Sequence, residues 1–491
     1  MHKFTQNINV PIVLRVLGWL LLIEGGYMLL PLCVSACYGE TQTAEAFLYS
    51  ALLTGGVGAV MAFGIHPKNL KMGSREGLLL TAIIWAFFSA FGMLPFLLSG
   101  MCHSVANAYF ETMSGFTTTG ATILGDLDSV PRGLLFWRSA TQWIGGMGII
   151  LFTLAVVPML NSTGGIALFN AEVTGITHDR MRPRVSQTAK DLWLLYIAMT
   201  VVLTLLLVKP MGFFDAVCHA LATVSTGGFS TKGEGLHYWH SYYIDTMIMV
   251  FMFLGGVNFT LLYGVTRGRV KQLRENDTFK WYFMIVAAAS VVIIARMASE
   301  HFCSNWGDRI VYAIFDTISA ITSTGFSTVN YEASGEFISL ILMLCMLVGG
   351  MAGSTAGGAK VDRLIVMLKN TKNSFYKVLH PNAVTAVRID GRSLNRTVVA
   401  KVVAFFSVYL IALVAAAIVM TAYDVPMFDA LFTSMSALSN VGFGYGVTGV
   451  DGSFLVLPDA VKWVLSFEMM VGRLELFTVL VVFTPAFWLK E

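Results

Sequence analysis

The stretch Ala106-Asn-Ala-Tyr-Phe-Glu-Thr-Met-Ser-Gly-Phe-Thr-Thr-Thr-Gly120 decides the fold, because versions of it occur four times in the chain. Each version is a moderately apolar run, too short to cross a bilayer, that ends in a turn rich in Ser, Thr and Gly. The other three versions run from Phe214 to Phe229, from Phe315 to Phe326 and from Phe428 to Phe443. One glycine from each, which we call the ladder glycine, aligns all four without a gap: Gly120, Gly228, Gly325 and Gly442.

The second version leaves two choices for its ladder glycine. Gly227 also lies in the turn, but only Gly228 keeps Asp215 in step with Asp429 of the fourth version. Another glycine motif follows each ladder glycine by 24 to 30 residues: Gly145-Gly146, Gly255-Gly256, Gly349-Gly350 and Gly472. The unit is therefore span, short helix, glycine turn and span, used four times with a period of about 107 residues. Internal repetition of this kind is a strong indication of fold.

The rest of the chain has the composition of a membrane protein. Of its 491 residues, 56% are hydrophobic and only 12% are charged, about half the charged share of soluble domains. Ten apolar segments are candidate bilayer spans, centred near residues 22, 55, 88, 150, 201, 255, 291, 347, 411 and 475. The sequence predicts an all-α membrane protein in which two extra transmembrane helices, in residues 1–75, precede four pore repeats around one pore. The predicted repeats occupy residues 76–160, 161–265, 266–358 and 359–491, and the second and fourth begin with a cytoplasmic connector.

The basic residues are distributed unevenly along the chain. The segments that we predict to lie inside hold 24 of the 32 Lys and Arg, and the segments that we predict to lie outside hold three. The predicted inner segments are 1–15, 65–76, 161–190, 266–280, 359–401 and the C-terminal end. The positive-inside rule then predicts a multi-pass protein with both termini in the cytoplasm. The basic runs are most simply topology signals at the lipid surface, so we expect membrane lipid and no nucleic acid as a partner.

Four equivalent turns that dip into a membrane predict a pore. Non-helical backbone at membrane depth is tolerated only where it is buried in protein or lines water. Glycine permits the backbone angles that turn carbonyls inward, and a ring of carbonyls can replace the hydration shell of a potassium ion. The short helices would aim their partly negative C-terminal ends at that ion. The alternative, ordinary Ser/Thr/Gly loops, is weakened by the gapless register of four copies, because loops are the most variable part of a chain.

Four motifs give the chain a resemblance to a known family. They are Ser114–Thr122, the stretch Gln142-Trp-Ile-Gly-Gly-Met-Gly148, Gly353-Ser-Thr-Ala-Gly-Gly-Ala-Lys360, and Gly472-Arg-Leu-Glu-Leu-Phe477. With them the whole chain resembles the TrkH/KtrB/HKT superfamily of potassium transporters, and its length and two leading spans resemble the TrkH branch. The resemblance implies a homodimer in the bacterial inner membrane, four joined repeats around one pore, and a nucleotide-binding regulatory subunit (TrkA-like) docked on the cytoplasmic side.

The resemblance also assigns a selectivity filter, with potassium as the transported ion and no bound cofactor. Plant members with Ser at the first ladder glycine favour sodium, so Gly120 indicates potassium. In the fourth repeat Asn440 and Val441 replace the Thr and Ser pairs, and we expect lower pore symmetry there. The filter residues that the resemblance implies are Thr118, Thr119, Gly120, Thr226, Gly227, Gly228, Ser323, Thr324, Gly325, Asn440, Val441 and Gly442.

A second glycine-rich segment predicts a gate. Five of the ten residues 349–358 are glycine, and each costs a helix up to about 1 kcal/mol relative to Ala. A mobile loop fits this density better than small-residue helix packing does, and in the resembling family the segment obstructs the pore below the filter. The residues assigned to the gate are Gly349, Gly350, Gly353, Ser354, Thr355, Gly357, Gly358, Lys360 and Arg473.

The role of Arg473 stays open at this stage. A charge within a span is costly and usually faces the protein interior. Glu475 lies two residues on and does not share a helix face with it. Arg473 would donate to gate-loop carbonyls, repel cations, or form a structural buried ion pair.

Two other classes of protein were weighed. An enzyme needs a paired nucleophile and base or a metal cluster, and the sequence has no H-E-x-x-H, no G-x-S-x-G and no metal-like cysteine spacing. A proton- or sodium-coupled symporter of the alternating-access type fits the glycine break, but not four direct repeats whose turns lie on one side. Four outer-side histidines were interpreted as isolated surface or packing residues: His103, His219, His237 and His240.

Overall fold

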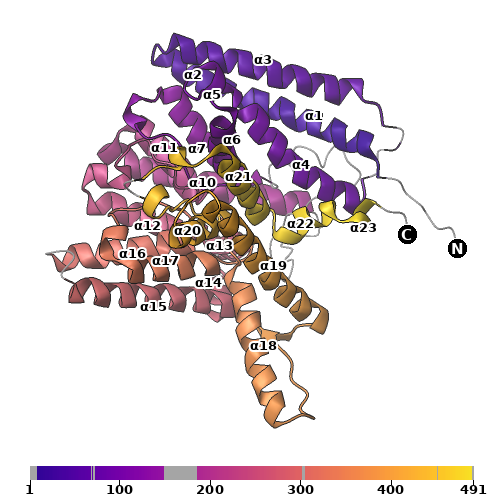
Figure 1. The fold of residues 1–491 in the computed structure, drawn as a ribbon, viewed down its shortest axis with the longest axis vertical. Coiled ribbons are helices and arrows are strands. Elements are labelled where there is room, and N and C mark those ends of the chain that lie inside the picture. Colours follow the sequence, from indigo (N-terminus) through magenta and orange to yellow (C-terminus); the bar gives the residue numbers. More distant parts are fainter. Residues whose placement is uncertain are drawn as a thin grey trace.

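The protein is almost entirely helical. The computed structural model describes residues 8–67, 69, 72–148, 185–300, 305–449 and 452–488. In these ranges the strands are limited to a hairpin in which β1 (Arg388–Ile389) pairs with β2 (Arg392–Ser393). Figure 1 shows the N-terminal helices along one side of the molecule and α18 (Val361–Leu379) projecting away from the body.

The N-terminal helices form a separate layer against the rest of the bundle. Helix α1 (Val10–Tyr27) lies beside α3 (Thr41–Gly64) in Figure 1, and α2 (Leu29–Cys37) connects them. The two long helices touch through glycines, since a methyl group at Gly18 would overlap the backbone of Ala62 and one at Gly58 would overlap the backbone of Leu22. Small residues allow this close approach of helices in a membrane.

The remaining elements repeat one order: a long helix, a short helix that ends in a turn, and a second helix. The long helices are α4 (Ser74–Gly92), α10 (Val185–Met211), α15 (Asp277–Ser299) and α19 (Arg396–Thr421). The short helices are α6 (Val105–Phe116), α11 (Phe213–Val224), α16 (Trp306–Ile321) and α20 (Met427–Leu438). The second helices are α7 (Arg132–Gly146), α12 (Tyr242–Gly255), α17 (Glu336–Val348) and α21 (Asp459–Arg473).

Short helices complete the connections. They are α5 (Leu94–Leu98), α13 (Phe259–Thr266), α14 (Val270–Glu275), α22 (Leu476–Leu480) and α23 (Pro485–Trp488). The 3-10 turns are η1 (Leu127–Ser129), η3 (Gly235–Trp239), η4 (Glu332–Ser334), η5 (Gly446–Thr448), η6 (Phe454–Val456) and η7 (Val481–Phe483).

The spans are more broken than the sequence predicts. Among the described residues, six helices are long and apolar enough to cross a membrane, and α12 with α13 makes a seventh that bends by 108°. The predicted spans near residues 347 and 475 are interrupted where α17 ends at Val348 and α21 at Arg473. The predicted centre near residue 150 lies outside the described residues. Each described second helix thus ends within two residues of its glycine motif, because glycine favours a change of backbone direction.

Candidate functional site

The four short helices end with the same hydrogen-bonded turn. In each turn, the amide of the second residue after the C-cap donates to the carbonyl of the residue five positions before it, at 2.8 to 2.9 Å. The amide of the first residue after the C-cap donates to the carbonyl of the residue three positions before it, at 3.0 to 3.2 Å. These are the two bonds of a Schellman motif. The residue in the left-handed conformation is not glycine here, and φ lies between 52° and 55° at Thr118, Thr226, Ser323 and Asn440. Such a conformation costs roughly 1–3 kcal/mol per non-glycine residue and clusters at functional sites.

The ladder glycines bring the four turns into a closed ring. Each has φ between 80° and 85°, and each lies directly against a carbonyl oxygen of another turn. An added methyl group would overlap that oxygen in four successive pairs: Gly120 with Gly227, Gly228 with Thr324, Gly325 with Val441, and Gly442 with Thr119. The order runs from the first turn to the fourth and back to the first. Four turns can contact in this cyclic order only if they surround a common axis.

The fourth turn keeps the backbone of the others. Asn440 and Gly442 have φ of 55° and 83°, within the range of the first three turns. Its difference lies in the side chains, because the Asn440 amide donates to the Thr119 hydroxyl at 3.0 Å and to the Met469 carbonyl at 2.8 Å. The expected loss of symmetry is therefore not visible in the backbone, and Asn440 joins the fourth turn to the first.

Gln142 is a site residue that the sequence analysis missed. Its side-chain amide donates to the Gly227 carbonyl at 2.6 Å, and its oxygen accepts from the Phe229 amide at 3.1 Å. It lies three residues before Gly145, and the same place before the other three glycine motifs is always methionine: Met252, Met346 and Met469. That single polar exception among four equivalent positions was a signal available in the sequence.

A second set of equivalent positions lies behind the turns. Nine residues before each ladder glycine stands a buried polar side chain: Glu111, His219, Asp316 and Thr433. Each contacts the chain that leaves its own turn. Glu111 accepts from the Ile123 amide at 2.9 Å, His219 Nε2 shares a hydrogen bond with the Ser230 hydroxyl at 3.1 Å, and Thr433 contacts the Thr448 hydroxyl at 2.8 Å. His219 is therefore a packing residue, as one of the two predicted alternatives has it, but it is neither on the surface nor isolated, since its buried ring packs against Trp239 and Phe326 and is hydrogen-bonded to Ser230 after the second turn.

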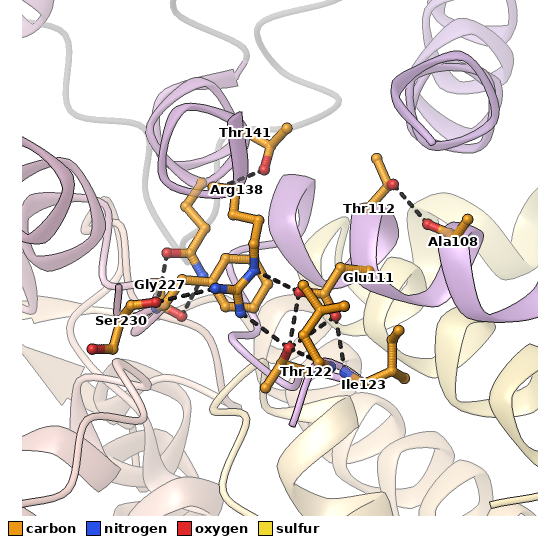
Figure 2. Close-up of polar contacts among 12 residues, drawn as sticks. Ala108, Glu111, Thr112, Thr122, Ile123, Arg138, Thr141, Gly227 and Ser230 are labelled. Atoms are coloured by element: carbon orange, nitrogen blue, oxygen red, sulfur yellow. Dashed lines mark hydrogen bonds and ion pairs between the residues drawn. The ribbon is translucent and has the colours of Figure 1, made fainter. Parts of the chain in front are cut away.

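In the first repeat this position carries a buried ion pair (Figure 2). Arg138 Nε donates to Glu111 at 2.7 Å, and both side chains are at most 2% exposed. The other guanidinium nitrogens donate to the Thr122 hydroxyl at 3.0 Å and to the Ser230 carbonyl at 3.1 Å. The Arg138 guanidinium thus neutralises the Glu111 carboxylate and links the first turn to the second. Its further hydrogen bonds help to offset the cost of removing both charges from water.

The glycine-rich segment between α17 and α18 lies against the ends of the short helices. The Thr355 hydroxyl donates to the Gly255 carbonyl at 3.1 Å and to the Val224 carbonyl at 3.3 Å. The Gly357 amide donates to the Ser323 hydroxyl, and a methyl group at Gly357 would overlap the Ser439 carbonyl. The segment therefore contacts the second, third and fourth repeats beneath their turns.

Arg473 connects this segment to the first repeat. It donates to the Thr355 carbonyl at 2.7 Å, to the Gly145 carbonyl at 2.8 Å and to the Gly146 carbonyl at 3.1 Å. Glu475 pairs instead with Arg363 at 2.6 Å. Of the roles left open for Arg473, donation to loop carbonyls is the one that these contacts match.

The other residues assigned to the gate hold the shape of the loop. Positive φ of 71° to 77° occurs at Gly349, Gly353, Gly358 and Lys360. Met351, beside Gly350, donates its amide to the Gly256 carbonyl at 2.9 Å, and the Ser354 hydroxyl donates to the Met351 carbonyl at 2.5 Å. The buried Lys360 ammonium donates to the Ala356 carbonyl. All nine assigned residues thus lie in or against one loop.

Comparisons with known proteins agree with this architecture. Residues 44–490 match the model of the TrkH family, described as cation transport protein. The Trk system potassium uptake protein TrkH of Escherichia coli (strain K12) is 35% identical over 97% of this chain and 99% of its own length. The TrkH of Halomonas elongata is 33% identical over 98% of this chain and 100% of its own length. The crystal structure of the potassium transporter TrkH from Vibrio parahaemolyticus superposes with a TM-score of 0.89 at 31% identity, covering 98% of this chain and 100% of that one.

Proposed function

Because this chain belongs to the TrkH family of cation transport proteins, we propose that it takes up potassium through the ring of four turns. It is a multi-pass membrane protein of a transporter family and not an enzyme. The observation that carries the proposal is the cyclic contact of each ladder glycine with the next turn. Potassium is the transported substrate in this account, as it is in the names of the relatives.

The filter would be built from backbone carbonyls at the ring. The residues just before the ladder glycines supply the carbonyls that lie against the neighbouring turns: Thr119, Gly227, Thr324 and Val441. Such carbonyls replace the hydration shell of potassium. The left-handed residues Thr118, Thr226, Ser323 and Asn440 fix the turns at the helix ends, whose partial negative charge favours a cation. Gln142 and the Glu111–Arg138 pair would keep the ring from collapsing or widening.

The glycine-rich loop would act as the gate in its closed position. It lies below the ring and is held at both sides, by Thr355 on the second repeat and by Arg473 on the first. Opening requires these bonds to break, and five glycines give the loop the freedom to move. A gate of this kind suits a passive pore rather than the alternating-access symporter that is the competing mechanism.

A cytoplasmic partner would drive the gate through α18. This helix begins one residue after Lys360 and ends in a highly exposed apolar tip, where Phe375, Val378 and Leu379 are at least 70% exposed. An exposed apolar patch of this kind marks a contact site. We assign it to a TrkA-like regulatory subunit, with the protein as a homodimer in the bacterial inner membrane and both termini in the cytoplasm.

Flux measurements on reconstituted protein test the function. Rubidium uptake into liposomes should exceed sodium uptake, and Gly120→Ser should lower this preference because the side chain displaces the Gly227 carbonyl. Gly125→Ser is the matched control, since a side chain at Gly125 meets no atom within 4 Å. Equal uptake of both ions by the unmodified protein would refute the proposed selectivity.

A further inference from the structure

A cavity of about 200 Å³ lies between the second and third repeats, away from the ring of turns. Its lining includes Asp245 of α12 and Thr328, which follows the third turn. Asp308 and Tyr242 also line it, and the tyrosine hydroxyl donates to the Asp308 carboxylate. The cavity has room for a few water-sized ligands, because a water occupies about 30 Å³ of liquid volume.

Two buried oxygens lack a hydrogen-bond partner: the hydroxyl of Thr328, which lines the cavity, and one carboxylate oxygen of Asp316, which is hydrogen-bonded to the Thr328 amide behind it. Thr328 is 2% exposed and its hydroxyl has none, although its carbonyl shares a hydrogen bond with His237 Nδ1 at 3.1 Å. Asp316 is also 2% exposed, and its Oδ1 has none, although its carboxylate accepts from the Thr328 amide. Buried polar groups are almost always hydrogen-bonded, so each exception requires an explanation.

The surrounding charge is negative. The Asp245 carboxylate acts electrostatically on that of Asp316, and Asp245 is only 7% exposed. In the part of the chain that the structure describes, no lysine or arginine forms an ion pair with either carboxylate. A buried carboxylate without a counter-charge is costly.

The first repeat provides an internal comparison. Glu111 occupies the position equivalent to Asp316, and the Arg138 guanidinium neutralises it. The residue equivalent to Arg138 in the third repeat, counted from the glycine motif, is Leu342. The third repeat thus keeps the buried acid of the first repeat and lacks the built-in cation, while the second repeat contributes a further acid, Asp245 of α12, to its surroundings.

We propose that Asp245, Asp316 and the Thr328 hydroxyl bind a monovalent metal cation, sodium or potassium, at a site separate from the four-turn ring. The ion supplies the positive charge that Arg138 supplies to Glu111 in the first repeat. Carboxylate and hydroxyl oxygens are suitable ligands for hard cations. Two carboxylates and one hydroxyl provide part of an oxygen shell, which water in the cavity completes.

This inference uses the repeat alignment and not the proposed conduction pathway. Its test is an anomalous difference map of crystals grown with thallium, which replaces potassium. We expect one peak bounded by Asp245, Asp316 and Thr328, which disappears when excess potassium or sodium competes. Peaks at the four-turn ring are scored separately, so failure of the filter proposal and failure of this site are distinguishable.

Two variants sharpen the test. Asp316→Asn should reduce the peak to background, whereas Asp308→Asn, at a cavity residue already engaged by Tyr242, should leave it unchanged. A wild-type map without the peak overturns the proposal even if the Asp316 variant fails to fold. A peak that appears with manganese and not with thallium overturns the monovalent assignment, and empty maps in both ions point to a shared proton instead.

Discussion

If the glycine-rich loop is the gate that we propose, replacing Arg473 by alanine should open it without help from a partner. The side chain bridges the loop and the first repeat through hydrogen bonds of 2.7 Å to the Thr355 carbonyl and 2.8 Å to the Gly145 carbonyl. Alanine removes both donors and leaves the filter turns untouched. The loop then keeps its contacts with the second, third and fourth repeats but loses its hold on the first.

The size of the effect follows from one charge-assisted hydrogen bond. Such a bond to the loop contributes about 1.5–3 kcal/mol net, and each 1.4 kcal/mol is a factor of about ten in an equilibrium constant. The ratio of closed to open gate should therefore fall by about 10- to 150-fold. Because a mostly closed channel has a small open fraction, rubidium leak should rise by a similar factor until the open state dominates.

The assay is rubidium uptake into liposomes that contain the purified protein alone. Arg473→Lys separates the possible roles, because an ammonium keeps the charge but lacks the planar fork that reaches both carbonyls. A latch predicts leak in both variants, whereas repulsion of cations predicts leak only in the alanine variant. Arg296→Ala, which removes an exposed ion pair with Glu300, should leave the flux unchanged. Unchanged flux in folded Arg473→Ala protein would refute the latch.

Three further predictions concern the filter supports and the cytoplasmic tip. Arg138→Met leaves Glu111 buried and unpaired, so the protein should lose about 3–5 kcal/mol of stability, seen as a lower melting temperature; an unchanged melting temperature would contradict the pairing. Gln142→Met makes the first repeat like the other three and removes the clamp on Gly227, so the rubidium-to-sodium ratio should fall severalfold while the protein stays folded, and a wild-type ratio would remove Gln142 from the filter support. Leu379→Asp, in the exposed tip of α18, should abolish capture of the regulatory subunit in a pull-down but leave basal flux intact, and undiminished capture would place the docking surface elsewhere.

Much of the architecture could be predicted because its signals are local. A helical membrane protein of this family follows from apolar segments and from motifs that recur at fixed places. The break points of the spans were harder to predict. A hydropathy window averages over Gly255-Gly256 and finds one span, whereas the structure bends by 108° there. A continuous span and a bent one have the same apolar composition, so the bend is encoded instead by the glycines, which free the backbone, and by Asn258, whose side chain caps the start of α13.

The supports of the site were not predictable in the same way. Gln142 contacts Gly227 across 85 residues of sequence, and Arg473 contacts Thr355 across 118. No local periodicity encodes such a pair. The repeat alignment does contain a clue for Gln142, because it is the one polar residue among four equivalent positions that otherwise hold methionine. Internal repetition within the chain thus identifies a support residue that local periodicity does not.

The central claim is that four equivalent turns surround one axis and select the ion together. The direct measurement is the rubidium-to-sodium uptake ratio of four matched variants, in which each ladder glycine in turn becomes alanine: Gly120→Ala, Gly228→Ala, Gly325→Ala and Gly442→Ala. The added methyl group overlaps a neighbouring carbonyl oxygen in every case, so all four ratios should fall. A wild-type ratio in any folded member of the set would show that its turn is not part of the filter.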